Sequence, residues 1–196
     1  MKIVSLSEKL KKEMRHSWLS NGRQESVAEH TWRVSLIAIL VEPYLDHDVH
    51  MEKLLKIIIL HDLIEAEAGD VPAFDSQSDP HIKQQKEERE LQAIMNIKNQ
   101  LPEDLGTDLY ELWMEFENKE SYEARVANAL DKLEAQIQHN EADLSTWLDV
   151  EKDMTFQLGK YVDFDSFLRE LKDHIERDGE DKMIQAEVHY NKPSSH

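Results

Sequence analysis

The sequence predicts an all-α fold, a packed bundle of roughly six to eight helices. Only five glycines and five prolines occur in 196 residues, while Leu, Glu, Lys and Ala are abundant, a composition that favours helix over sheet. Apolar residues recur at helical spacing in several segments, and no segment shows the alternation typical of a strand. The hydrophobic fraction of 40% and this length suit one domain with a sizeable core.

The N-terminal part is expected to hold two helices separated by a polar loop. Ser5 or Ser7 can cap a first helix that runs to about Met14, and residues 15–23 are predicted to form the loop. The segment Ser26-Val27-Ala28-Glu29 has the spacing of a capping box, so a second helix should begin there.

The second helix has one apolar face that includes a histidine, because helical spacing aligns His30, Val34, Ile37 and Val41. His30 is therefore expected to point inward, one turn into the helix. Pro43 ends or kinks this helix. A third helix should span about residues 51–68 and end at Gly69. Its interior line consists of Leu54, Ile58, His61 and Glu65.

The middle of the chain carries further helix start signals. Residues 69–78 are loop-like, and Asp79-Pro80 supplies an N-cap and a first-turn proline for a long polar helix reaching about Gln100. Pro102 opens another helix, and Ser121 can cap the next. The apolar stripe of that helix consists of Val126, Leu130, Leu133 and Ile137, with Asp131 beside it.

Two amphipathic segments, near 144–158 and 164–175, complete the predicted helices. We expect residues 1–177 to form a single helical domain. Residues 178–196 are polar with little periodicity, and they are expected to form a loosely held C-terminal tail.

Composition also narrows the class of partner and the chemistry. The formal net charge of −18 argues against a nucleic acid polymer or an anionic membrane as partner, but a bound cation would still allow a small phosphate ester. The absence of cysteine leaves His and carboxylates as the expected metal ligands. No signal peptide is recognisable at the start, and no apolar run is long enough to span a bilayer, so a cytoplasmic protein is expected.

One stretch places charged groups directly after a buried aliphatic run. Four large aliphatic residues, 57–60, precede His61-Asp62, with Glu65 one turn later and Asp70 just beyond the helix end. Buried His and Asp are costly unless a partner such as a divalent metal neutralises them. Taken singly, each of these residues could equally be a hydrogen-bonded core histidine or a surface aspartate.

The order of these residues along the chain and their positions on helices favour one shared metal site over a separate structural role for each residue. The pattern Glu29-His30, His61-Asp62 and Asp131 resembles the HD-domain superfamily of metal-dependent phosphohydrolases. The surrounding motifs are similar to its 5′-deoxynucleotidase branch, and the resemblance covers about residues 10–140. These motifs are Arg15…Trp18…Gly22-Arg23…Glu25-Ser26-Val27-Ala28-Glu29-His30, His61-Asp62-Leu63-Ile64-Glu65…Gly69-Asp70 and Ala129-Leu130-Asp131-Lys132-Leu133.

The resemblance implies an HD-type helical bundle with one divalent ion, which could be Mn, Co, Fe, Mg or Zn, and a tendency to form homodimers. The implied metal ligands are His30, His61, Asp62 and Asp131. Glu65 would be the acid/base residue, Arg15 a phosphate contact, and Asp70 a contact to substrate or to its attacking water. Lys132 would either share the task of Arg15 or face solvent, and its helical position favours solvent.

One departure from the family concerns the sugar. Bacterial members have Trp directly after the arginine, whereas this chain has His16 there and Trp18 three residues after Arg15. Trp18 is the candidate for an apolar wall that rejects ribose, and the alternative is that it packs on the first helix.

The expected activity is hydrolysis of nucleoside 5′-monophosphates, chiefly the deoxy forms. The alternatives are another HD-type hydrolase for a signalling or cyclic nucleotide, a non-catalytic nucleotide or metal sensor, and a helical interaction protein. A single metal is expected because only His81 lies between Asp62 and Asp131. The other histidines are expected at the surface: His47, His50, His139, His174, His189 and His196.

Overall fold

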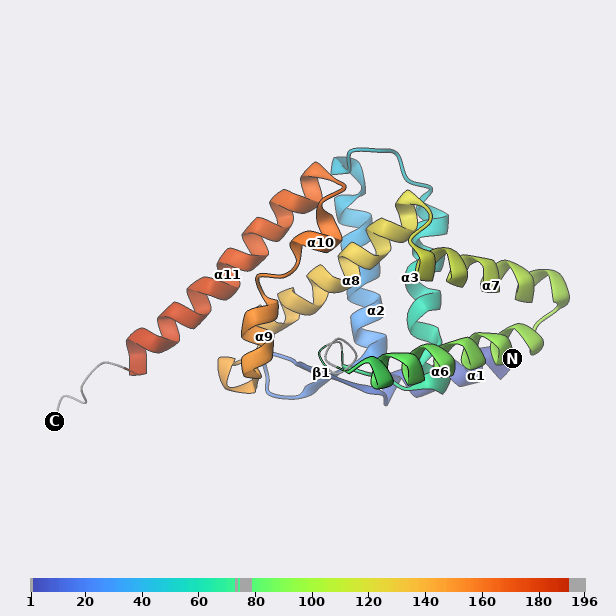
Figure 1. Ribbon diagram of the computed structural model, residues 1–196, viewed down its shortest axis with the longest axis horizontal. Helices are drawn as coiled ribbons and strands as arrows, with labels where there is room; N and C mark the ends of the chain where they lie inside the picture. The colour runs from blue at the N-terminus through green and yellow to red at the C-terminus, as the bar shows by residue number, and fades with distance from the viewer. Residues whose placement is uncertain (1, 73, 75–78, 191–196) are drawn as a thin grey trace.

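The computed structural model describes residues 2–72, 74 and 79–190, with side chains described to residue 186. Among these residues, six helices have 13 or more residues, which confirms the predicted all-α bundle (Figure 1). They are α2 Val27–Val41, α3 Met51–Leu63, α6 Pro80–Asn99, α7 Glu103–Asn118, α8 Tyr122–Glu141 and α11 Ser166–Tyr190. No helix in the described ranges is long and apolar enough to cross a lipid bilayer.

Short elements connect these helices. The N-terminus holds α1 Lys2–Leu6 and η1 Ser7–Lys11, and η2 Glu42–Tyr44 follows α2. The connection between α8 and α11 contains η3 Leu144–Thr146, α9 Asp149–Met154 and α10 Gly159–Val162. The predicted caps Ser26, Asp79 and Ser121 all accept a hydrogen bond from the first turn of their helices, and Ser26 with Glu29 forms the full capping box.

Helix α8 lies at the centre of the main core and packs against α2, α3 and α11 (Figure 1). Three residues of its predicted stripe, Val126, Leu130 and Leu133, are buried and Ile137 is half-buried, because the stripe faces apolar residues of all three helices. Leu130 and Leu133 of α8 have no exposed surface, and neither do Val34 of α2, Leu54 of α3 and Leu168 of α11. This arrangement brings the inward faces of α2, α3 and α8 close together.

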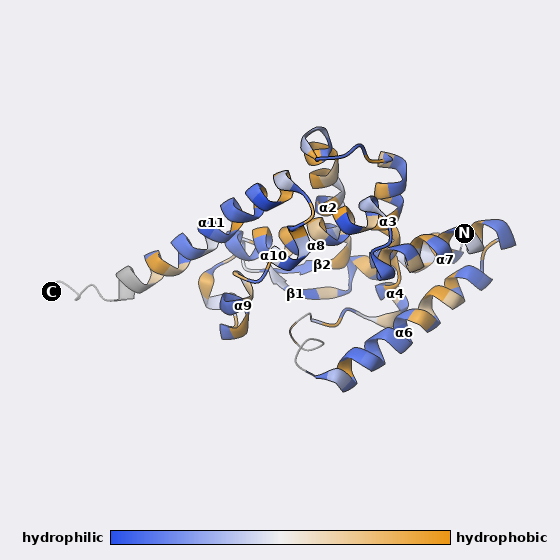
Figure 2. Ribbon diagram, turned by 45° about the horizontal axis from the view of Figure 1, so that its top comes forward, coloured by the Kyte–Doolittle hydropathy of each residue, from blue (hydrophilic) through white to orange (hydrophobic). Residues whose placement is uncertain are grey.

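A second apolar cluster joins α6 and α7 to the end of α3. The two helices approach closely at Gly106, where an added Cβ would lie 2.5 Å from the carbonyl oxygen of Lys98. The ribbons of α6 and α11 alternate between hydrophilic and hydrophobic residues in Figure 2, as expected of helices with one side in solvent.

Residues 14–26 contain a β-hairpin where the sequence predicts a helix end followed by a polar loop. Strand β1 (Met14–Trp18) pairs antiparallel with β2 (Gln24–Ser26), and Gly22 adopts a φ of +82° in the turn between them. The prediction of no strands is therefore wrong. Strands this short carry too few residues for a detectable alternation.

The third predicted helix is divided. Helix α3 ends at Leu63, and α4 (Glu65–Ala68) begins directly after Ile64. Gly69 ends α4 with a φ of +79°, which confirms the predicted stop. The helix is thus interrupted at Ile64, between His61 and Glu65.

The C-terminal helix α11 runs to Tyr190 and so continues past residue 177, the expected end of the helical domain. The side chain of Asn140 donates to the Ile175 carbonyl, and Lys182 donates to the Asn140 carbonyl at 2.9 Å. An added Cβ at Gly179 would lie 2.9 Å from Thr155. These contacts with α8 and α9 keep the helix attached past residue 178.

Candidate active site

One cavity, here called the central cavity, brings together residues predicted from five separate segments. It has a volume of about 380 Å³ and lies between α2, α3, α4, α6, α7, α8 and the N-terminal hairpin. Its lining includes Arg15, His30, His61, Asp62, Glu65, Asp70 and Asp131. Every predicted metal ligand therefore lines the same cavity as the predicted acid/base residue and phosphate contact.

His30 is held by a carboxylate on each side of its ring. Its Nδ1 contacts Glu134 and its Nε2 lies 2.9 Å from Asp131 Oδ1, while the residue itself is only 1% exposed. Burial and the charge of Arg15 lower the pKa of His30, but Glu134 and Asp131 raise it to about 10. A metal ion bound at Nε2 would take the place of the proton at that atom.

His61 presents its Nε2 to the same cavity. Its Nδ1–H donates to the Ile58 carbonyl at 2.7 Å, which leaves Nε2 as the acceptor atom. That Nε2 lies 3.1 Å from Asp62 Oδ1. The other carboxylate oxygen of Asp62 accepts a hydrogen bond from the Thr31 hydroxyl of α2. Neighbouring groups thus orient both His61 and Asp62. Residues that bind a metal ion directly are usually oriented in this way.

Asp131 is the fourth predicted metal ligand. Burial raises the pKa of its carboxyl, but Lys132 and His30 hold that pKa well below its ordinary value, so the group is ionised. Lys132 Nζ lies 2.7 Å from Asp131 Oδ2, and its side chain is 33% exposed. Lys132 lines the central cavity while a third of its side chain stays exposed, so it can both face solvent and contribute to the site.

Glu65 and Asp70 line the same cavity, and both carboxyl groups have raised pKa values. Burial raises the pKa of the Glu65 carboxyl well above its ordinary value, and the charges of Asp62 and Asp70 add to the effect. Burial likewise raises the pKa of Asp70, against the opposing charge of Arg15. A half-buried carboxyl with a raised pKa beside metal-type ligands suits proton transfer.

Arg15 reaches the cavity from strand β1. Its Nη1 lies 3.1 Å from Glu25 Oε2 and 3.4 Å from Glu134 Oε2. Burial lowers the pKa of the guanidinium, but Glu134, Asp131 and Glu25 raise it, so the group stays charged. The guanidinium therefore offers a fixed positive charge at the edge of the cavity.

A second group of potential ligands lies behind His30. Single ligand atoms of Glu25, His30 and Glu134 lie within 4.8 Å of one another, and all three residues are buried. The guanidinium of Arg15 already bonds both carboxylates, and Arg33 Nε lies 3.5 Å from Glu134 Oε1. Because two arginines supply the positive charge there, a metal ion fits better on the Nε2 side of His30.

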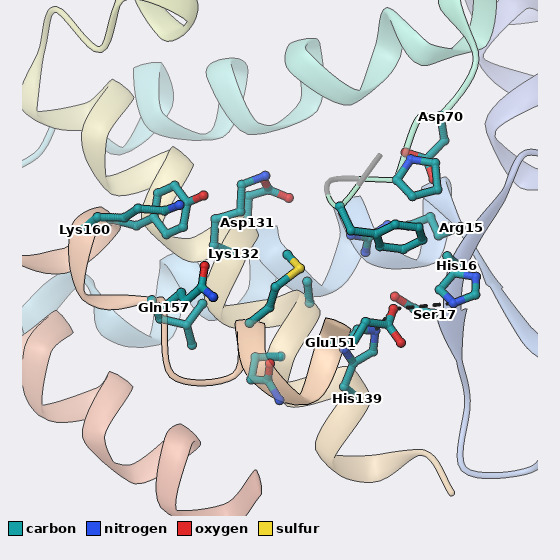
Figure 3. A pocket seen from close by; sticks show the side chains of 17 residues that line it. Arg15, His16, Ser17, Asp70, Asp131, Lys132, His139, Glu151, Gln157 and Lys160 are labelled. Atoms are coloured by element: carbon teal, nitrogen blue, oxygen red, sulfur yellow. Dashed lines mark hydrogen bonds and ion pairs between the residues drawn. The ribbon is translucent and has the colours of Figure 1, made fainter. Parts of the chain in front are cut away.

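A smaller cavity of about 130 Å³, here called the adjoining cavity, shares Arg15, Asp70, Asp131 and Lys132 with the central cavity. Figure 3 shows its two ends. His16, His139 and Glu151 gather at one end, while Gln157 and Lys160 lie at the other. Phe74 packs edge-on against the ring of His16 at a centroid distance of 5.3 Å.

The end near Glu151 has unused hydrogen-bonding capacity. Glu151 Oε1 lies 3.5 Å from His16 Nε2 and 3.6 Å from His139 Nε2, and the buried His16 Nε2 has no hydrogen-bond partner among the described residues. Burial lowers the pKa of His139 to about 4 and raises that of Glu151. His139 lines this cavity, so its predicted surface position is wrong, whereas His47, His50 and His174 are exposed as predicted.

Trp18 does not line either cavity. It is half-buried at the end of β1, where its carbonyl accepts a hydrogen bond from Gln138 Nε2 at 2.7 Å. His16 stands in the cavity wall instead. The described structure thus separates Trp18 from the other predicted site residues.

Several site residues carry no role in the sequence-based prediction. In the sequence Glu25 stands out only as part of a motif, and no local pattern assigns a role to Glu134 or Glu151. Glu134 follows Asp131 by three positions, which is a helical signal that it shares the inward face. No comparable local signal marks Glu151, because its partners come from β1 and α8.

The family comparison agrees with this geometry. A family model described as an HD domain matches residues 7–172, so the chain belongs to the HD domain family. The 5′-deoxynucleotidase HDDC2 of Danio rerio is 33% identical over 143 residues, which cover 72% of this chain and 68% of the relative. The human protein of the same name is 32% identical, with coverage of 72% and 67%. The 5′-deoxynucleotidase hdd1 of Schizosaccharomyces pombe is 31% identical, with coverage of 71% and 75%.

Solved structures are similar along most of the chain. A predicted metal-dependent phosphohydrolase from Magnetospirillum magnetotacticum is 30% identical with a TM-score of 0.75, covering 91% of this chain and 92% of that one. A conserved hypothetical protein from Pyrococcus furiosus is also 30% identical, with a TM-score of 0.66 and coverage of 90% and 98%.

Proposed function

We propose that this HD domain protein is a metal-dependent phosphohydrolase that removes the 5′-phosphate from nucleoside monophosphates, chiefly deoxynucleotides. The observation that carries the proposal is the central cavity, where two histidines and two aspartates meet Glu65, Asp70 and Arg15. The relatives named 5′-deoxynucleotidase support the choice of substrate.

The metal ligands in this proposal are His30, His61, Asp62 and Asp131. The set fits a divalent ion because both imidazoles can offer Nε2 and both carboxylates lie beside them. Nitrogen and oxygen ligands accept Mn, Co, Fe, Mg or Zn. When bound, the ion supplies Lewis acidity and an activated water. We propose a single ion, since the additional candidate His81 is exposed at the start of α6.

The protein groups supply the remaining chemistry. Arg15 and Lys132 neutralise the nonbridging phosphate oxygens from the boundary shared by the two cavities. Glu65 exchanges a proton with the water or the leaving oxygen, and its raised pKa, caused by burial, favours the protonated form. Asp70 accepts a hydrogen bond from the sugar or the water.

The nucleoside would extend from this boundary into the adjoining cavity. Its sugar would lie near Asp70 and its base near the unpartnered Nε2 of His16 and the carboxylate of Glu151. The ring of His16, braced by Phe74, is then the candidate wall against ribose, in place of Trp18.

The proposal also includes a cytoplasmic homodimer without nucleic acid or membrane partners. The net charge of −18 supports the exclusion of polyanionic partners. Exposed apolar side chains along α2 support self-association: Trp32, Leu36, Ile39 and Leu40 are 39–66% exposed. Analytical ultracentrifugation of the whole protein tests the dimer.

The test of function is a phosphate-release screen on chelated protein to which single divalent metals are restored. We expect hydrolysis of dAMP, dGMP, dCMP, dTMP and dUMP, and slower turnover of ribonucleotides by about 10²-fold, the size of discrimination expected for one hydroxyl. Equal rates with deoxyribonucleotides and ribonucleotides would contradict the proposed preference for deoxynucleotides. Activity confined to cyclic or signalling nucleotides would contradict nucleoside monophosphates as the substrate class.

A further inference from the structure

The carboxylate of Glu134 connects the two halves of the proposed site. Its Oε2 accepts a hydrogen bond from His30 Nδ1–H on α2 and another from Arg15 Nη1 on β1. The other oxygen, Oε1, lies 3.5 Å from Arg33 Nε. Glu134 has no exposed surface, so water does not replace any of these partners.

Glu25 provides a natural comparison, because it is equally buried and contacts only one of the two halves. It is 1% exposed, and its Oε2 accepts a hydrogen bond from Arg15 Nη1 at 3.1 Å. Among the described contacts, it makes no hydrogen bond to His30. Both carboxylates therefore pair with the phosphate contact, but only Glu134 also pairs with a metal ligand.

A carboxylate on the far ring nitrogen of a metal-binding histidine has two effects. It fixes the tautomer and the ring orientation, and it makes the coordinating nitrogen more basic. In His30 this bond leaves Nε2 directed at the central cavity, 2.9 Å from Asp131 Oδ1. The same Glu134 oxygen restrains the planar guanidinium of Arg15, whose position decides how it meets a phosphate.

We propose that Glu134 is a positioning residue that holds His30 for metal binding and Arg15 for phosphate binding through one side chain. The inference rests on the proposed function for the identity of the two ligands. The inference goes further than the proposed function, because it assigns to the buried carboxylate of Glu134 the alignment of both His30 and Arg15.

The test compares Glu134→Gln with Glu25→Gln in the full-length protein, each after chelation. Both variants replace a buried carboxyl group beside Arg15 with an amide of the same shape, so the difference between them reports on the contact with His30. Titration with Mn²⁺ measures metal affinity, and titration of the Mn²⁺-loaded protein with inorganic phosphate measures anion affinity. We expect Glu134→Gln to weaken Mn²⁺ binding by about 10–100-fold, the usual effect of losing such a partner.

Glu25→Gln is expected to leave Mn²⁺ affinity nearly unchanged, while both variants weaken phosphate binding. Equal losses of Mn²⁺ affinity would overturn the inference, because they would point to general charge loss or to an ion held between Glu25 and Glu134. Far-UV circular dichroism and thermal unfolding of the metal-free variants check that both are folded.

A measurement on the unaltered protein covers the case in which Glu134→Gln does not fold. Long-range ¹H–¹⁵N NMR of the Zn²⁺-loaded protein should find His30 protonated at Nδ1 and metal-bound at Nε2. Coordination through Nδ1 would overturn the inference. The Mn²⁺ titration and the NMR measurement do not depend on phosphatase activity. A failure of the proposed function can therefore be distinguished from a failure of the proposed role of Glu134.

Discussion

His30 Nε2 and Asp131 Oδ1 lie 2.9 Å apart, although 101 positions separate the two residues in the sequence. The contact forms because α2 and α8 pack their apolar faces together, with Val34 and Leu130 both fully buried in the same core cluster. Each polar residue sits among these apolar residues. Core packing therefore sets the distance between two proposed metal ligands.

Replacing Asp131 tests the metal assignment. Asp131→Ala should remove most bound divalent metal and activity while leaving helix content nearly intact, because the residue lies at a cavity wall. Elemental analysis after dialysis measures the metal. Asp149→Ala, which removes a 99% exposed carboxylate on α9, is the matched control. Full metal occupancy in Asp131→Ala would assign Asp131 to a structural role.

Glu65→Gln separates proton transfer from binding. The amide keeps the shape but cannot exchange a proton, so kcat should fall by about 10²–10⁴-fold, the range for a lost acid/base group. Metal content and substrate affinity should change little. Glu67→Gln alters an exposed carboxylate on the same short helix and should retain activity. Near-normal turnover of Glu65→Gln would exclude it as the acid/base residue.

Variants at His16 and Trp18 test which of the two side chains produces the preference for deoxyribose over ribose. His16→Ala should narrow the deoxy/ribo ratio of kcat/KM, since His16 lines the adjoining cavity. Trp18→Ala should leave that ratio unchanged, because Trp18 lies outside both cavities. Steady-state kinetics with dAMP and AMP gives both ratios, and metal content should stay constant. The reverse pattern would restore Trp18 as the sugar contact.

His139 should make stability depend on pH below neutrality. Burial lowers its folded-state pKa to about 4, so between about pH 6.5 and 4 the unfolded chain binds more protons than the folded one. Its contribution is present above pH 6.5 and is lost as pH falls through 4. Urea unfolding of His139→Gln should show a smaller loss of stability over this window than wild type. His174→Gln, an exposed histidine on α11, should unfold like wild type at each pH. An unchanged pH slope in His139→Gln would contradict the prediction.

Local patterns were sufficient for most helices and for part of the site. Caps such as Ser26 and Ser121 were predictable because they bond backbone groups within three residues. The inward positions of His30 and Asp131 followed from the helical period, which depends only on neighbours along the chain. The hairpin was missed because its short strands have no periodicity, and α11 was predicted too short because its later contacts are with α8 and α9.

The sequence by itself determined which side chains face the core and which chemistry they can support, since helical period and cap chemistry act over a few residues. Only the tertiary structure decided which of them meet. Arg15 reaches Glu134 across 119 positions because β1 lies against α8, and the same packing sets His16 rather than Trp18 in the cavity wall. Such contacts depend on how whole elements dock, and docking depends on shape complementarity spread over many residues rather than on any local pattern.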